Sequence, residues 1–270
     1  HPLFLAEPNS ESNIQLGLTA WAKGLPKVKG TPSELLLRLQ IARWAIALGK
    51  KQQARSALRS AAECGEIDSH TWCEIGAAWA AIGAVESGAD AYARALEQIP
   101  DSDPQVIQIE LERARLLAGT TKRVQDACVA AELVRVSGDV VQRAAAGDLL
   151  ASIFESRDDW DGLLRLARAE LAISDSQLEH KWLGLLASAY EGSGDLLGCA
   201  AQLERIVRER PNDPDLLVRL ESLYRRMDDR DALESILRRM LTWSESPQEK
   251  LGIRCRLAMH LQACDASAAI

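Results

Sequence analysis

Apolar residues follow the period of an α-helix along most of the chain. In residues 13–25, Ile14, Leu18, Trp21 and Leu25 fall on one stripe at spacings of three or four residues. Such a stripe predicts a helix that buries one face and exposes the other. The composition agrees, because Ala, Leu and Arg are abundant while Phe and Tyr are scarce, a mixture that favours helices over sheets. We therefore expect an all-α protein.

One stretch carries a regular order of large and small residues. From Ser69 onward this order is Trp72, Ile75, Gly76, Trp79, Gly83, Gly88, Tyr92, Ala95 and Pro100. Equivalent residues recur at nearly the same spacing in residues 41–61, 186–211 and 220–233. A period of about 34 residues predicts an array of helix pairs, each with a first helix A and a second helix B.

The spacing is looser in the middle of the chain. Between residues 103 and 179 the pattern is degenerate, and several extra residues fall near 120–123 or 137–142. Residues 24–30 carry Gly, Pro and Lys and are expected to form a linker. The small residues of the clearer copies let paired helices approach closely, and Gly83 and Gly194 suit the left-handed turn that ends an A helix.

Helix starts are repeated as well. Asp103 and Asp213 each precede a proline, so their carboxylates are expected to cap a helix whose first position is Pro. Residues 31–34 (Thr-Pro-Ser-Glu) and 246–249 (Ser-Pro-Gln-Glu) have the pattern of a capping box around the same proline. All four segments open an expected A helix and support the period independently of the apolar pattern.

These residues together resemble the tetratricopeptide repeat family, in which a Trp, a Leu-Gly pair, an aromatic, small residues and a closing Pro occupy fixed places. Here Trp79 stands at the usual Tyr position and Gly88 at the usual Ala position. The resemblance implies a right-handed superhelical solenoid of antiparallel helix pairs. It also implies that the A helices line a concave face, where partners of the family usually bind.

The repeat suggests a division of the chain. Residues 1–34 are interpreted as an N-terminal partial repeat or cap followed by a linker, and residues 35–270 as the array. The expected units are 35–68, 69–102, 103–143, 144–179, 180–213 and 214–247, with a terminal half unit at 248–270.

Charge and cysteine content narrow the possible functions. The net charge of -7 has both signs interspersed, which argues against general binding to nucleic acid or to an anionic membrane. No run of about 18 apolar residues predicts a membrane span. The six cysteines form no C-x-x-C pair and mostly fall within apolar helical patterns. We expect free core thiols, hence a reducing, cytoplasmic location, with three disulfides as the alternative.

The two ends of the sequence suggest a longer protein. Residues 1–5 lack an initiator Met and a basic segment, so they are not typical of a signal peptide. The C-terminal residues stop abruptly after an apolar pattern. The interpretation is that both ends were cut from a larger polypeptide. Segments such as Leu-Tyr-Arg-Arg-Met look like units of bacterial tetratricopeptide proteins.

No catalytic or cofactor motif is apparent, so we expect no enzyme activity and no cofactor. His70, His180 and His260 are expected at the surface, and no G-x-S-x-G surrounds a serine. The acidic pairs at 158–159 and 228–229 fall at expected turns between helices, where no cleft separates their pKa values. The Gly-rich residues 191–195 lack the Lys of a phosphate loop.

The resemblance places a partner-binding surface on the A helices. The expected lining is Arg43, His70, Cys73, Ala77, Asp148, Ser152, Lys181, Ser188, Arg219, Ser222, Arg225, Arg226 and Arg256. The paired Lys and Asn residues with which well-known members grip a C-terminal carboxylate are absent, so a clamp for chaperone tails is not expected.

Four of these residues form a C-terminal arginine set, Arg219, Arg225, Arg226 and Arg256, expected to face one stretch of groove. Guanidinium groups suit carboxylates and phosphates. One hypothesis is that the set engages an acidic segment of a partner or of the same polypeptide. The alternative is that these arginines pair with Glu221, Asp215 and Glu249.

The leading functional interpretation is a protein-protein interaction scaffold that belongs to a larger regulatory or assembly protein. The alternative is a regulatory domain that senses a ligand or peptide and controls an attached effector. An enzyme would need a polar cluster in the groove, which the sequence does not suggest.

Overall fold

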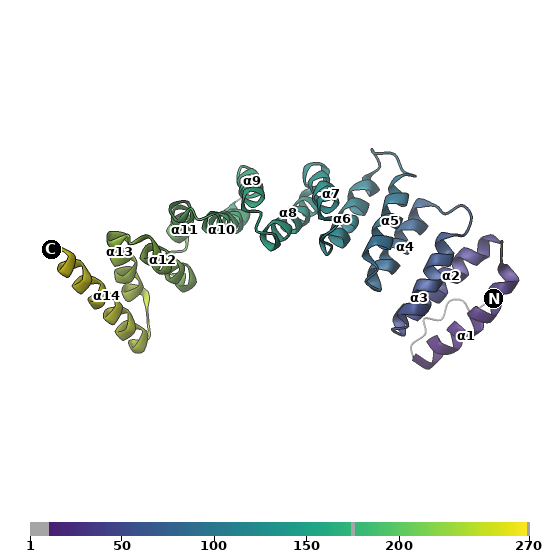
Figure 1. Ribbon diagram of the computed structural model, residues 1–270, viewed down its shortest axis with the longest axis horizontal. Helices are drawn as coiled ribbons and strands as arrows, with labels where there is room; N and C mark the ends of the chain where they lie inside the picture. The colour runs from purple at the N-terminus through teal and green to yellow at the C-terminus, as the bar shows by residue number, and fades with distance from the viewer. Residues whose placement is uncertain (1–10, 174–175, 269–270) are drawn as a thin grey trace. The chain divides into compact units, whose positions relative to one another are not determined.

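The computed structural model describes residues 11–173 and 176–268, and within them it contains only α-helices and turns (Figure 1). The chain divides into two compact units, His1–Leu150 and Ala151–Ile270. The expectations for residues 1–5 and for the side chain of Cys264 lie outside the described part. The all-α expectation is confirmed.

The first unit is a stack of helices in chain order. It contains α1 (Glu11–Val28), α2 (Pro32–Ala47), α3 (Lys51–Ala62), α4 (Ser69–Ala81), α5 (Val85–Leu96), α6 (Pro104–Ala118) and α7 (Val124–Ser137). Each helix packs on the next, and α2 also packs on α4, the A helix one pair later. The boundary between the units falls within α8 (Val140–Ser156).

The second unit repeats this architecture. It contains the end of α8 followed by α9 (Trp160–Leu171), α10 (Ser176–Gly192), α11 (Leu196–Glu209), α12 (Pro214–Met227), α13 (Arg230–Trp243) and α14 (Pro247–Ala268). From α9 to α14, each helix packs on the next. Each unit is therefore solenoid-like, built from stacked helix pairs. The residue bounds of the repeats and the handedness of a superhelix stay predictions.

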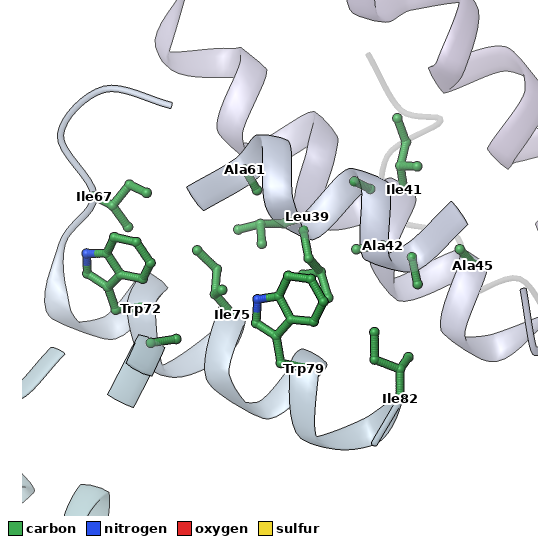
Figure 2. Packing of buried hydrophobic residues seen from close by; sticks show 14 of the residues in the cluster. Leu39, Ile41, Ala42, Ala45, Ala61, Ile67, Trp72, Ile75, Trp79 and Ile82 are labelled. Carbon is green, nitrogen blue, oxygen red and sulfur yellow. The ribbon is translucent and has the colours of Figure 1, made fainter. Parts of the chain in front are cut away.

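The core of the first unit explains the large and small residues of the repeat (Figure 2). Trp72, Ile75 and Trp79 lie on one side of α4 and pack with residues of α2 and α3. A side chain at Gly76 would begin 3.0 Å from the Tyr92 ring, so glycine lets α5 pack tightly on α4. Burial raises the pKa of Tyr92 to about 12, as suits a packing residue.

The other tryptophans, which were expected to lie largely in the core, differ in how far they are buried. Trp182 is buried, and Trp44 and Trp160 are partly buried. Trp21 packs against Trp44 with ring centroids 5.1 Å apart. Trp243 is about half exposed, as expected for a residue outside the repeat register.

Turns between paired helices use left-handed residues, as the sequence suggests. Gly83 and Gly194 have φ values of 75° and 85°. In two other pairs Asp158 and Asp228 take the same place with φ of 54° and 52°. Asp tolerates this conformation better than most residues because its short polar side chain bonds locally.

Helix starts follow the prolines, but of the two expected capping boxes only the Ser246–Glu249 half of the second forms. Asp103 accepts from the Gln105 amide, and Asp213 from the amides of Asp215 and Leu216, as expected. At α2, however, the Thr31 hydroxyl donates to the Val28 carbonyl. The Thr31 amide is also bonded to that carbonyl, so Glu34 accepts from Gly30 instead.

The second expected box, at α14, also differs. The Ser246 hydroxyl lies 3.5 Å from the Glu249 amide, a long contact, and the Glu249 carboxylate accepts from Ser244 at 3.0 Å. Proline position predicts the helix start, whereas the bonds depend on the path of the preceding turn.

Two further expectations need correction. The linker expected at residues 24–30 is shorter, because α1 continues to Val28 with Pro26 inside it and Leu25 packed against the core. Of the cysteines whose side chains are described, all are free, but only Cys199 is fully buried and Cys255 is exposed. The extra residues of the third pair lie between α6 and α7, near residues 120–123.

Candidate functional site

The residues expected to line a partner groove all lie on A helices, but they are divided between the two units. In the first unit, Arg43 is on α2, His70, Cys73 and Ala77 are on α4, and Asp148 is on α8. In the second, Ser152 is on α8, Lys181 and Ser188 are on α10, Arg219, Ser222, Arg225 and Arg226 are on α12, and Arg256 is on α14. Each unit therefore has to be considered as a surface of its own.

In the first unit these residues serve different purposes. The Arg43 guanidinium donates to Glu74 at 2.8 Å and joins α2 to α4. Cys73 is partly buried against the core, and burial raises the pKa of its thiol. His70 and Ala77 are exposed. Arg43 and Cys73 thus support the stacking of the A helices.

In the second unit a glutamate of α10 holds two of the C-terminal arginine set. Arg219 donates to the Glu191 carboxylate at 2.9 Å, and Arg226 donates to its other oxygen. Arg219 also lies 3.3 Å from the Ser188 hydroxyl. Partial burial acts to raise the pKa of Glu191, but the hydrogen bonds from the two arginines outweigh it and lower that pKa below its ordinary value.

A glutamate of α12 holds the other two arginines. Glu221 is only 3% exposed, and one of its oxygens accepts from Arg225 at 2.7 Å. The Arg256 guanidinium of α14 forms an ion pair with the other oxygen at 2.9 Å, although its angle falls outside hydrogen-bond geometry. The short distance between opposite charges in a buried place makes this a real electrostatic contact.

The four arginines are therefore paired within the chain, as the alternative interpretation supposed. Of the partners it named, Glu221 is confirmed, whereas Asp215 and Glu249 are not used and Glu191 takes their place. The pairs Glu191–Arg226 and Glu221–Arg256 both span 35 residues, about one repeat, and join successive A helices. This recurrence is a sequence signal that could have found them.

A pocket of about 440 Å³ opens between α12, α13 and α14. Leu233 and Leu237 form its buried floor, and Met259 is an exposed apolar edge. Its remaining lining is Arg225, Asp228, Asp229, Arg230, Arg256 and His260. An apolar floor with a charged rim suits one or two side chains of a bound segment.

No protein-family model matches the sequence, and no curated protein matches it. Among solved structures, the chain is similar to a tetratricopeptide repeat protein from Parabacteroides merdae ATCC 43184, with 13% identity, a TM-score of 0.46 and 93% of each chain covered. The chain is tetratricopeptide-like in fold. The recurring helix pairs and their small and large residues, described above, carry this assignment.

Two other solved structures are similar in the same way. One is the TPR2AB-domain:pHSP90 complex of yeast Sti1, at 14% identity and a TM-score of 0.34, over 92% of this chain and 90% of that one. The other is the C-terminal part of a TPR repeat-containing protein from Cytophaga hutchinsonii, at 12% identity and a TM-score of 0.39, over 89% and 94%.

Several of the groups considered for catalysis have structural roles in this tetratricopeptide-like chain. Asp159 and Asp229 cap α9 and α13 by accepting from backbone amides, so the acidic pairs belong to the turns. His180 is more buried than expected and lies 2.9 Å from Glu209. Within the described residues no group of three or more His, Cys, Asp or Glu could hold a metal, and no helix is long and apolar enough to cross a membrane.

Replacing Glu191 by glutamine is expected to destabilise the second unit at neutral pH but not in acid. Because the folded-state pKa of Glu191 is lowered from 4.5, its charge stabilises the fold fully above that pH. This stabilisation is lost as the pH falls through the folded-state pKa. Urea unfolding of wild type and Glu191→Gln from about pH 7 down to about pH 3 would measure the difference.

The matched control for this experiment is Glu245→Gln. Glu245 is exposed and makes no ion pair with any residue that the structure describes. It should leave the unfolding free energy nearly unchanged at every pH. A Glu191→Gln effect that persisted undiminished in acid would show that packing, and not the charge, is responsible.

Proposed function

We propose that this chain is a protein-interaction scaffold that binds a segment of a partner on its A helices and has no catalytic site of its own. The observation that carries the proposal is the pocket between α12, α13 and α14, in which the A helices α12 and α14 supply Arg225 and Arg256 and the B helix α13 supplies the floor, Leu233 and Leu237. Such a surface offers apolar anchoring and hydrogen-bond donors together, as peptide-binding grooves do.

The position of the pocket supports the same function. Glu221 fixes Arg225 and Arg256 at its edge before any partner arrives. Side chains held in place lose less conformational entropy on binding, which favours affinity. Ser222 and Arg226 continue the exposed A-helix surface from this pocket along α12.

An acidic residue in the bound segment would be recognised at Arg225. Its side chain is 60% exposed, so it can share its guanidinium between Glu221 and an incoming carboxylate. The pocket as a whole is nearly balanced, because Asp228 and Asp229 lie beside the arginines. We therefore propose a mixed apolar and acidic segment here, from a partner or from the same polypeptide.

The wider setting is proposed on chemical grounds. Thiols at Cys64, Cys73 and Cys199, which form no disulfide, favour a reducing compartment such as the cytoplasm. A binding module without catalytic groups acts only by bringing its partner proteins or domains close to one another. We accordingly propose that the chain works within a larger regulatory or assembly protein.

Site-specific photo-crosslinking tests this function. A benzoylphenylalanine at Ser222 or Met259 should yield the same covalent adduct in an extract of the native organism, because both positions adjoin the proposed surface. The adduct yield at Met259 should fall about threefold in an Arg225→Gln background, as expected for loss of one exposed charged contact.

The control position is Arg208, which is exposed on α11, a B helix of the same unit. It should give no adduct. Adducts at Arg208 alone, or equal yields at all three positions, would contradict a partner surface on the A helices. If the adduct yield at Met259 were unchanged by Arg225→Gln, the scaffold function would still stand. The proposal that Arg225 recognises an acidic residue of the bound segment would be contradicted.

A further inference from the structure

A second pocket of about 440 Å³ lies on the B-helix side of the first unit. Its walls come from α3 and α5, and Trp72 and Trp79 of α4 reach it from below. These two rings are each 7% exposed, so only their edges are available to a ligand. The trough is separate from the pocket of the second unit in sequence and in the helices that line it.

Three arginines surround this trough. Arg55 and Arg59 lie one turn apart on α3, and Lys51 lies one turn before them. Arg94 of α5 stacks over the Trp72 ring, 4.8 Å from its centroid. Neither Arg55 nor Arg59 forms an ion pair with any residue that the structure describes. Like charges one turn apart destabilise a helix unless an anion neutralises them.

Acidic groups at the trough do not neutralise this charge. Asp90 lies at the edge but already pairs with Arg123 at 2.8 Å. Glu63 is the other carboxylate of the lining. The trough is therefore net positive on a chain whose total charge is -7. The C-terminal arginine set forms ion pairs with Glu191 and Glu221. In contrast, the guanidinium groups of Arg55 and Arg59 keep N–H donors that can bind a ligand.

The positions of the charged and apolar residues in the trough favour an acidic peptide over a compact polyanion. Arg55 and Arg59 stand on one wall and Arg94 on the other, with Ala62, Ala84 and Ala91 and the tryptophan edges between them. A compact polyanion would bring dense negative charge against Glu63 and Asp90. A peptide can space its carboxylates to meet the guanidinium groups and place apolar side chains between them.

We propose that the trough between α3 and α5 binds an acidic segment of a partner protein, in which Asp and Glu alternate with apolar residues. The arginine forks of α3 receive the carboxylates, and the apolar side chains cover the edges of Trp72 and Trp79. This site does not depend on the A-helix surface of the second unit, because it uses other helices in the other unit.

Fluorescence anisotropy with a labelled peptide pool tests this site. The pool contains short peptides of Asp, Glu, Leu and Phe in random order, so that no single sequence has to be guessed. It should bind the wild-type chain more tightly than a pool in which Asn and Gln replace Asp and Glu. In an Arg225→Gln background, which removes the carboxylate contact proposed for the second unit, Arg55→Gln/Arg59→Gln should bind about tenfold more weakly, and wild-type binding should weaken as salt rises.

The matched control is Arg157→Gln/Arg165→Gln, which removes the same charge from exposed arginines of the second unit that also lack ion pairs among the described residues. It should bind like wild type, while Arg55→Lys/Arg59→Lys should recover only part of the affinity because lysine lacks the fork. Circular dichroism would verify that every variant is folded. Equal binding of both pools, an equal loss in the control, or displacement of the peptides by an equal concentration of inorganic phosphate would overturn the proposal.

Discussion

Replacing Leu220 by alanine is expected to lower the free energy of unfolding by about 3 kcal/mol. Leu220 has no exposed surface and lies in the core of the second unit with Leu203, Ile206 and Leu237. Its truncation removes apolar contacts and leaves a cavity that the surrounding helices fill only partly. Urea unfolding followed by tryptophan fluorescence or circular dichroism would measure the loss.

The prediction also specifies which helices Leu220→Ala destabilises. In a stack where each helix contacts only its neighbours, a local defect acts mainly on the adjacent pairs. Hydrogen exchange should therefore lose protection first in α11, α12 and α13. The control is Leu197→Ala on α11, where the side chain is 71% exposed and the expected change is below about 0.5 kcal/mol. A similar cost for both variants would contradict the core assigned to Leu220.

Replacing Gly88 by valine is expected to cost about 2–3 kcal/mol. A Cβ atom at this position would lie 2.6 Å from a methyl of Leu116 and 3.2 Å from the Gly76 carbonyl oxygen. The leucine can turn away, but the carbonyl belongs to α4 and moves only if α4 and α5 separate. The two further methyl groups of valine enlarge the clash. Thermal or urea unfolding would measure the cost.

A glycine in open space provides the opposite control. A Cβ atom added at Gly184 of α10 meets no atom within 4 Å. Gly184→Ala should raise the free energy of unfolding by about 0.5–1 kcal/mol, because alanine is the better helix former. If Gly88→Val and Gly184→Ala shifted stability in the same direction, the close contact between α4 and α5 could not be the reason for glycine at position 88.

Local signals explain why much of the fold could be predicted. The caps at Asp103 and Asp213 and the left-handed glycines at 83 and 194 depend only on residues a few positions away. The order of tryptophan and small residues depends on the helical period and on the packing of one helix on the next. These features depend on residues within one repeat, so they can be predicted from a single sequence.

The candidate sites could be predicted only in part. The arginines at 219 and 226 share one glutamate and those at 225 and 256 share another, whereas a common groove for all four stays a prediction. Their charge is taken up by Glu191 and Glu221; the contacts of Arg219, Arg226 and Arg256 join successive A helices, whereas that of Arg225 lies within α12. No sequence pattern pointed to the arginines at 55 and 59, which form no ion pair with any described residue, because the absence of a partner is a property of the folded surroundings.

The sequence by itself therefore determined that this chain is a stack of tetratricopeptide-like helix pairs, and where most of those helices begin and turn. Only the tertiary structure decided which charges neutralise one another and which remain available. The physical reason is range: a helix and its cap form from neighbours along the chain, whereas an ion pair across about one repeat depends on how buried side chains set one helix against the next. A shift of one turn in that packing would change the partners of the interhelical ion pairs, such as Glu191–Arg226, without changing a single helix.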